Sequence, residues 1–140
     1  MDAELHVAVK AFIVHEGKVL LIRMAKDYIP ENAFEYDVPG GKVKAGEKFA
    51  EGLKREVNEE TGLSVRIGEA FSISEWWPMD KGKQHHIVGT FIECFSDTEE
   101  VRLSSDHDKF VWIKPEDFQN YLLIGTVPDA FKDYIRFKKL

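Results

Sequence analysis

The chain has 140 residues, of which 44% are hydrophobic and 31% are charged. This length and composition predict one globular domain, residues 1–140, with a core of its own. The formal net charge of −6 disfavours a stable nucleic-acid partner, because a general nucleic-acid binder presents a basic surface.

Cysteine content and hydropathy indicate a cytoplasmic protein without a membrane partner. Cys94 is the single cysteine, so no internal disulfide can form, and its apolar neighbours predict a core position rather than a nucleophile. The apolar run at residues 7–14 is interrupted by Lys10 and has no small-residue cleavage site after it. No segment is long enough to span a bilayer.

The first forty residues alternate apolar runs with turn residues, which predicts a hairpin, a loop and a short strand. The expected elements are strands at residues 5–15 and 18–24 joined by a turn at 16–17, a loop at 25–35, and a short strand at 34–39. At Gly40 and Gly41 we expect a sharp turn, where glycine lets the backbone approach a phosphate or offer a carbonyl to a metal ion. Lys42 adds a positive charge beside this turn; it either contacts a phosphate or stays exposed.

A helix is predicted from about residue 48 to residue 61. The segment is rich in good helix formers, and Gly62 follows it where a left-handed cap is favoured. Phe49, Leu53 and Val57 recur every four residues, so we expect them to form the buried stripe of the helix.

Three acids crowd one side of this helix. Glu56, Glu59 and Glu60 occupy neighbouring surface positions, where like charges repel one another. A solvated helix face is one interpretation, and a bound cation that relieves the repulsion is the other. Carboxylate oxygens suit Mg²⁺ or Mn²⁺ better than Zn²⁺, which prefers His and Cys. Arg55 can reach Glu47 at the helix start.

The second half of the chain predicts further strands and two C-terminal helical segments. The expected elements are strands at 64–76, 84–95 and 108–114, a turn at 77–83, an acidic connector at 96–105 with a short strand at 101–103, a helix start at 114–118, and a final helix from 127 to 135. Phe131, Tyr134, Ile135 and Lys138 lie on one face of the last helix. Strands on both sides of an acidic helix predict a mixed sheet between helices, in an α/β or α+β fold.

The stretch from Gly41 to Leu63 resembles the Nudix box. The specified positions of that motif are filled by Gly41, Glu47, Arg55, Glu56, Val57, Glu59, Glu60, Gly62 and Leu63. The Trp-x-x-Pro-Gly-Gly pattern that often precedes the box carries Tyr36 in place of Trp. The resemblance implies an α/β fold, the Nudix-type α/β/α sandwich with a central mixed β-sheet.

The resemblance also implies a metal-dependent hydrolase of diphosphate bonds. By analogy with the family, Glu56, Glu59 and Glu60 bind Mg²⁺ (or Mn²⁺), and the Gly40 carbonyl assists. Water then attacks phosphorus. Glu47 and Arg55, which we count with the catalytic set, pair to brace the loop against the helix.

The general base is not fixed by the resemblance. It is either a box glutamate, Glu56 or Glu59, or an acid on a loop far along the chain. Asp106 and Asp108 are the loop candidates, ahead of Glu99 and Glu100, and each is equally well read as a solvated surface residue. The predicted substrate contacts are Gly41, Lys42, Tyr36, Trp76, Asp106 and Asp108, with Phe34 and Trp77 as further aromatic residues that could stack on a base.

Histidine spacing gives no sign of a zinc site. His85 and His86 are adjacent in a predicted strand, so they should point to opposite faces of the sheet.

The leading function is a Mg²⁺-dependent pyrophosphohydrolase that cleaves a nucleoside triphosphate to a monophosphate and pyrophosphate. The partner is then a small-molecule nucleotide, and a homodimer is left open. The first alternative is hydrolysis of ADP-ribose or another nucleoside diphosphate joined to a sugar or a second nucleotide. Pro78 lies near the place where a proline tends to mark ADP-ribose hydrolysers, although a turn explains it equally well. A non-catalytic nucleotide sensor is disfavoured, because such members commonly lose box glutamates.

Overall fold

A computed structural model describes residues 2–140. The strands are β1 (Glu4–His15), β2 (Lys18–Met24), β3 (Tyr36–Asp37), β4 (Gly40–Lys42), β5 (Arg66–Trp76), β6 (Met79–Asp80), β7 (Lys83–Phe95) and β8 (His107–Ile113). The α-helices are α1 (Phe49–Thr61) and α2 (Val127–Lys138), and two 3₁₀ helices are η1 (Pro30–Asn32) and η2 (Pro115–Asn120).

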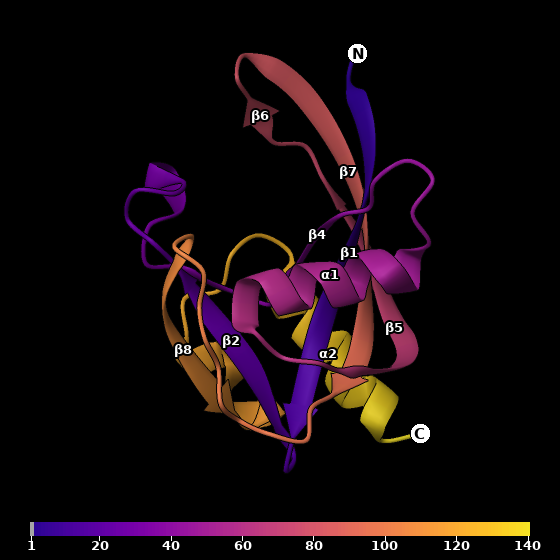
Figure 1. The fold of residues 1–140 in the computed structure, drawn as a ribbon, viewed down its shortest axis with the longest axis vertical. Helices are drawn as coiled ribbons and strands as arrows, with labels where there is room; N and C mark the ends of the chain where they lie inside the picture. Colours follow the sequence, from indigo (N-terminus) through magenta and orange to yellow (C-terminus); the bar gives the residue numbers. More distant parts are fainter. Residues whose placement is uncertain (1) are drawn as a thin grey trace.

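The strands form a mixed sheet with the central order β3-β2-β1-β7-β5 (Figure 1). β1 and β7 run parallel, from Glu4 opposite His85 to Val14 opposite Phe95. The remaining pairs are antiparallel: β4 adds to β1, β8 to β2 and β6 to β7. The β1–β2 hairpin turns at Glu16 and Gly17, whose positive φ angles of 50° and 78° match the right-handed twist of the strands.

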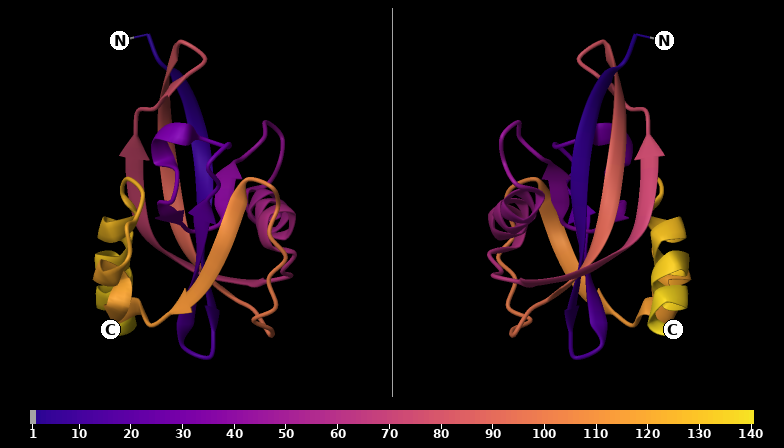
Figure 2. Two further views of the ribbon diagram at one scale, coloured as in Figure 1. Left: turned by 90° about the vertical axis from the view of Figure 1, so that its left-hand side faces the viewer. Right: turned by 90° about the vertical axis from the view of Figure 1, so that its right-hand side faces the viewer.

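The two α-helices cover opposite faces of this sheet, as the side views in Figure 2 show. Side chains along β1 alternate between the two layers, as strand geometry requires. Val9 and Ala11 pack with Leu53 of α1, whereas Phe12 packs with Phe131 of α2. The predicted mixed sheet between helices is confirmed, and β1 contributes to both halves of the core.

The predicted helix before Gly62 is also confirmed, and Gly62 caps it in the left-handed conformation, with φ of 73°. Its buried stripe begins later than predicted. Leu53 and Val57 are fully buried, but Phe49 is 56% exposed because it occupies the first helical position, ahead of the turn that meets the sheet.

Two other expectations were wrong. Gly40 and Gly41 are not only a turn, because they form strand β4 on β1. Residues 101–103 form no strand: the Arg102 N–H donates to the Thr61 carbonyl at 2.8 Å, so this backbone satisfies the end of α1 instead of the sheet. The predicted helix start at 114–118 is confirmed: it is the 3₁₀ helix η2, with Pro115 in its first turn.

Cys94 is fully buried, as predicted, and burial raises the pKa of its thiol to about 12. A thiol in this position stays protonated and is a poor nucleophile. None of the helices within residues 2–140 combines the length and the apolar character needed to cross a bilayer.

Candidate metal and active site

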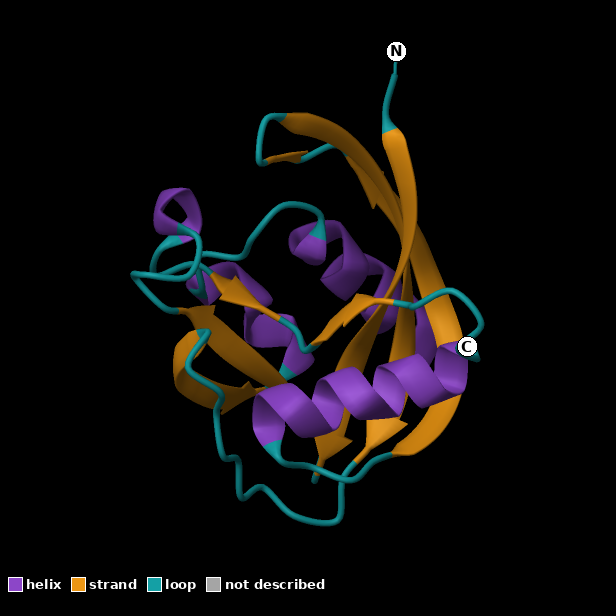
Figure 3. Cartoon of the chain, turned by 45° about the horizontal axis from the view of Figure 1, so that its top comes forward, coloured by secondary structure: helices purple, strands orange, loops and turns teal. Residues whose placement is uncertain are grey.

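The glycine pair in β4 brings the backbone against both β1 and the acidic helix. Gly40 has φ of 148°, and a Cβ there would lie 2.1 Å from the Val9 carbonyl oxygen. A Cβ on Gly41 would lie 2.6 Å from the carboxyl carbon of Glu56. The Gly40 N–H donates to Glu60 Oε1 at 2.8 Å. A side chain at residue 40 would collide with the backbone of β1, and one at residue 41 would displace the Glu56 carboxylate, so the two glycines let β4 pass close to both β1 and α1 (Figure 3).

Arg55, in the middle of α1, ties this helix to the segment before it. Its Nε and Nη2 donate to the two carboxylate oxygens of Glu47 at 2.7 and 3.0 Å. The same guanidinium donates to Glu56 Oε1 at 2.9 Å and to the Lys42 carbonyl at 3.3 Å. Bidentate pairs of this kind fix geometry as well as charge. The Arg55 hydrogen bonds, followed by the Lys44 N–H, lower the pKa of Glu47 to about 2.

Removing the Glu47–Arg55 pair should weaken Mg²⁺ binding by the box glutamates without abolishing it. We expect Glu47→Gln to lower turnover by roughly 10–100-fold, the usual cost of losing a group that orients a metal ligand. The Mg²⁺ concentration for half-maximal rate should rise, because Arg55 no longer holds Glu56 in place. A Mg²⁺ titration of the initial rate measures both effects.

Lys54→Gln is the matched control, since Lys54 is an exposed neighbour of Arg55 on the same helix. An unchanged Mg²⁺ requirement in Glu47→Gln would show that the pair serves the fold alone.

A buried acid–base cluster lies beneath the glycine strand. Lys10 Nζ donates to Asp37 Oδ2 at 3.0 Å, and the two side chains are 12% and 17% exposed. Burial acts to lower the pKa of Lys10, but the charges of Asp37 and Glu60 outweigh it and the pKa is raised. Burial raises the pKa of Glu60 to about 7, although Lys10 and the Gly40 N–H act against the rise. Lys10 is therefore the cation that compensates these acids.

The three box carboxylates lie in different surroundings. Glu60 turns inward to Gly40, Glu56 pairs with Arg55, and Glu59 is 57% exposed with one oxygen 3.5 Å from Arg55. The carboxylate oxygens of the three residues therefore do not all lie within 4.8 Å of one another. The donor set consists of oxygen atoms, and the Glu56 carboxylate fills the space beside Gly41. These residues fit a hard divalent cation such as Mg²⁺.

The candidate loop acids lie in different surroundings. Asp108 accepts two hydrogen bonds from Arg23, at 2.8 and 3.2 Å, and this pairing lowers the pKa of Asp108. The Asp106 carbonyl accepts the Ala25 N–H, which places Asp106 beside the loop that precedes β3. Glu99 and Glu100 are exposed on the irregular backbone of the connector.

The predicted aromatic contacts lie in separate places. Tyr36 packs edge-on against Tyr121, with ring centroids 5.5 Å apart, on the α2 side of the sheet. Trp76 covers Gly89, where an added Cβ would lie 2.5 Å from the indole. Trp77 stacks on His86 instead, at 4.8 Å.

His85 and His86 point to opposite faces of the sheet, as predicted. His85 is 7% exposed and lies 3.4 Å from the Lys42 ammonium, whereas His86 contacts Glu75 at 2.8 Å. The Lys42 side chain therefore reaches the face that carries His85.

Sequence reasoning missed Lys10, Asp37 and His107. His107 is 6% exposed, its Nδ1 lacks a hydrogen-bond partner, and burial lowers its pKa. A lysine that interrupts an apolar strand was a visible signal for Lys10, but its partner is 27 residues away. Only the register of the sheet joins the two.

Known proteins resemble this chain in sequence and in fold. The family model of the NUDIX domain matches residues 4–133. The nucleoside triphosphatase NudI of Escherichia coli K12 is 28% identical over 121 residues, covering 78% of this chain and 82% of NudI. The structure of a MutT protein from Methanosarcina mazei Go1 superposes with a TM-score of 0.85 at 26% identity, covering 100% of this chain and 99% of that one. An ADP-ribose pyrophosphatase from Streptococcus suis has a TM-score of 0.63 at 19% identity, covering 85% and 79% of the two chains, and shows the fold alone.

Proposed function

Since the chain belongs to the NUDIX domain family and is a hydrolase of phosphoanhydride bonds, we propose that it cleaves a nucleoside triphosphate to a monophosphate and pyrophosphate. The observation that carries the choice of substrate is the similarity to NudI, named as a nucleoside triphosphatase, over most of both chains. The acids of α1 facing the glycine pair support the chemistry.

We assign the metal to Glu56, Glu59, Glu60 and the Gly40 carbonyl. A Mg²⁺ ion bound there, or Mn²⁺ in its place, would neutralise phosphate charge and polarise a phosphoryl oxygen. Phosphoryl transfer depends mainly on positioning and charge neutralisation, so the contribution of the protein is to hold these oxygens in place. Arg55 holds the Glu56 carboxylate through a hydrogen bond of 2.9 Å, and the Gly40 N–H holds the Glu60 carboxylate through another.

The general base is assigned to a box glutamate. Glu59 is 57% exposed and the least engaged of the three, so its carboxylate is free to take a proton from water. Glu56 is the other box candidate, although Arg55 holds one of its oxygens. Asp108 is less suited because its pairing with Arg23 favours the ionised form and lowers its basicity. Asp106 remains the loop alternative.

Substrate contacts are assigned to the sheet face that carries Lys42 and Trp76. Gly41 brings the backbone next to Glu56, and the Lys42 ammonium lies at the end of the same strand. A phosphate chain between Gly41 and Lys42 would meet both the metal and a positive charge. Trp76 would offer an aromatic surface for a base.

A product panel tests the proposal. The purified protein is incubated with Mg²⁺ and nucleoside triphosphates, ADP-ribose or dinucleotides, and the products are separated by chromatography. We expect the fastest turnover with a triphosphate, giving pyrophosphate rather than inorganic phosphate, and none after the metal is removed with EDTA.

Faster turnover of ADP-ribose would favour the alternative substrate class. Pro78 does not decide it, because its carbonyl accepts the His85 N–H at 2.9 Å and so closes the β6–β7 hairpin. No turnover of any compound with Mg²⁺ or Mn²⁺ would contradict the proposal.

A further inference from the structure

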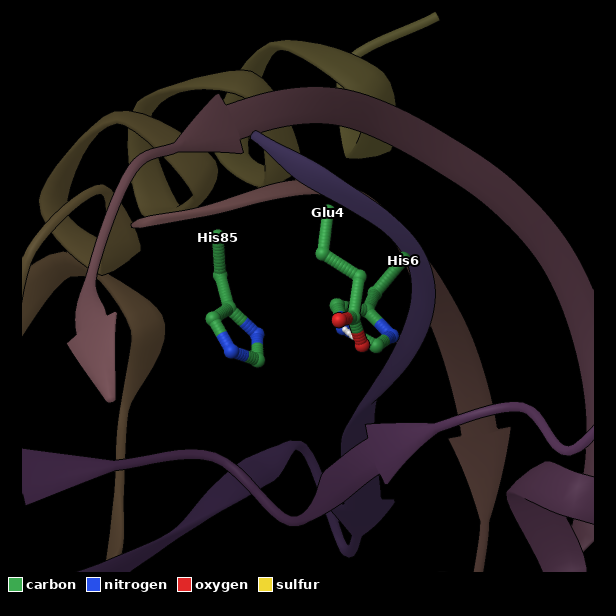
Figure 4. Close-up of side chains that lie close together, drawn as sticks. All are labelled: Glu4, His6 and His85. Atoms are coloured by element: carbon green, nitrogen blue, oxygen red, sulfur yellow. Dashed lines mark ion pairs between the residues drawn. The ribbon is translucent and has the colours of Figure 1, made fainter. Parts of the chain in front are cut away.

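Three side chains that could ligate a metal gather near the N-terminal end of β1, outside the acidic box. Glu4 and His6 come from β1 and His85 from β7, and Figure 4 shows all three pointing to the same side of the sheet. One nitrogen or oxygen atom of each lies within 4.8 Å of the others. Within residues 2–140, no other group of three His, Cys, Asp or Glu side chains comes together so closely.

The sheet register creates this juxtaposition. Glu4 is paired with His85 across the parallel strands, and His6 is two residues further along β1 on the same face. Both strands lie in the most extensive pairing of the sheet, which holds their backbones in fixed positions. Ligands on strands are placed more firmly than ligands on loops.

One histidine nitrogen of this group, His6 Nε2, has no hydrogen-bond partner. His6 Nε2 lies 2.9 Å from Glu4 Oε1, but this contact lacks hydrogen-bond geometry, and the buried nitrogen has no hydrogen-bond partner. The His6 and His85 rings stack at 4.7 Å with 16° between their planes, so the rings must tilt toward each other by side-chain rotation for both to ligate one ion. Two histidines and a carboxylate thus offer electron pairs in one place.

Cations already gather at this position. The Lys42 ammonium lies 3.4 Å from His85 Nδ1, and the Lys83 ammonium lies 2.5 Å from Glu4 Oε2. Lys42 is exposed and the Lys83 side chain is 61% exposed, so either ammonium can move into solvent. A divalent ion of higher charge would compete with both for the same electron pairs.

We infer that Glu4, His6 and His85 form a second metal site, for Zn²⁺ or a similar imidazole-binding transition metal. Two histidines and one glutamate are a known three-ligand set for zinc, with a fourth position left to water or substrate. Bond lengths of about 2.0–2.2 Å require the ligand atoms to close in from their present spacing, which flexible side chains allow. The nitrogen donors separate this site from the oxygen donors of α1, which suit Mg²⁺.

Zinc binding in the presence of excess Mg²⁺ tests the inference. EDTA-treated protein is returned to millimolar Mg²⁺, which fills oxygen-only sites, and titrated with Zn²⁺ against a chromophoric chelator. We expect one Zn²⁺ per chain in the wild type, and at least ~100-fold weaker binding in His6→Gln and in His85→Gln, because each loses a ligand. Co²⁺ in place of Zn²⁺ should give visible absorption bands that both variants lose.

His86→Gln is the matched control, because His86 adjoins His85 on the opposite face and should leave Zn²⁺ binding unchanged. Circular dichroism checks that each variant is folded. If His85→Gln misfolds, His6→Gln still tests the inference, because the His6 side chain is more exposed than that of His85. No stoichiometric Zn²⁺ in the wild type, or equal affinity in the wild type and His6→Gln, would overturn the inference.

Discussion

Replacing Glu59 by glutamine is expected to lower turnover by about a thousandfold or more while the protein stays folded. Loss of a group that only orients a metal ligand costs 10–100-fold, and Glu59 is assigned to ligand and base roles directly. Its side chain is 57% exposed, so an amide of the same size disturbs no packing. Steady-state rates at saturating Mg²⁺, with pyrophosphate release as the readout, measure the loss.

Glu51→Gln is the control, because Glu51 is an exposed acid in the first turn of the same helix. It should retain nearly full activity and the same thermal midpoint. Near-normal turnover in Glu59→Gln would remove Glu59 from both assigned roles and leave Glu56 as the box base.

Replacing Lys10 by methionine should cause the largest loss of stability of any substitution considered. Asp37 and Glu60 would then be acids without their compensating cation. Breaking a buried pair costs about 3–5 kcal/mol, and we expect about 3 because both side chains keep some contact with solvent. That cost corresponds to a fall of roughly 10 °C in the thermal midpoint. Urea unfolding of the metal-free protein measures the change in unfolding free energy.

The loss of unfolding free energy in Lys10→Met should be larger at pH 8 than at pH 5. Glu60 holds its proton more tightly in the folded protein, with a pKa raised from 4.5 to about 7, so its ionisation costs stability as the pH rises through that interval. Lys10 opposes this cost when Glu60 is ionised, and its removal matters less when Glu60 is protonated.

A double mutant completes the test of Lys10. Lys10→Met with Asp37→Leu should recover part of the lost stability, since one of the uncompensated acids is gone. Lys18→Met, at an exposed position in β2, should change the unfolding free energy by no more than about 0.5 kcal/mol. A loss in Lys10→Met as small as in Lys18→Met would show that Lys10 is not needed to compensate the acids.

Local signals predicted α1 and the hairpin, because each is encoded within one short segment. Glu56 and Glu60 are four residues apart, which by itself puts them on one helix face. Glu16 and Gly17 favour the turn that they form. The exposure of Phe49 could not be predicted in this way, since it depends on where the sheet meets the helix.

Long-range register explains what the sequence did not predict. Lys10 meets Asp37 because β1 lies between β2 and β7 while β4 folds back onto it. His85 meets Glu4 because β1 and β7 are parallel and in register. Residues 101–103 have strand-forming side chains, but their backbone bonds to the end of α1. In each case the partner is distant in the chain, and local periodicity carries no information about it.

The parallel pairing of β1 with β7 also sets the order in which the molecule can fold. β1 ends at His15, whereas β7 begins at Lys83. At synthesis rates of about 5–20 residues per second, β1 waits seconds to tens of seconds for its central partner. Pairings this distant in sequence make folding slow. A nascent chain that ends before β7 therefore carries an apolar first strand with an open edge, which is a place where it can pair with other chains and aggregate.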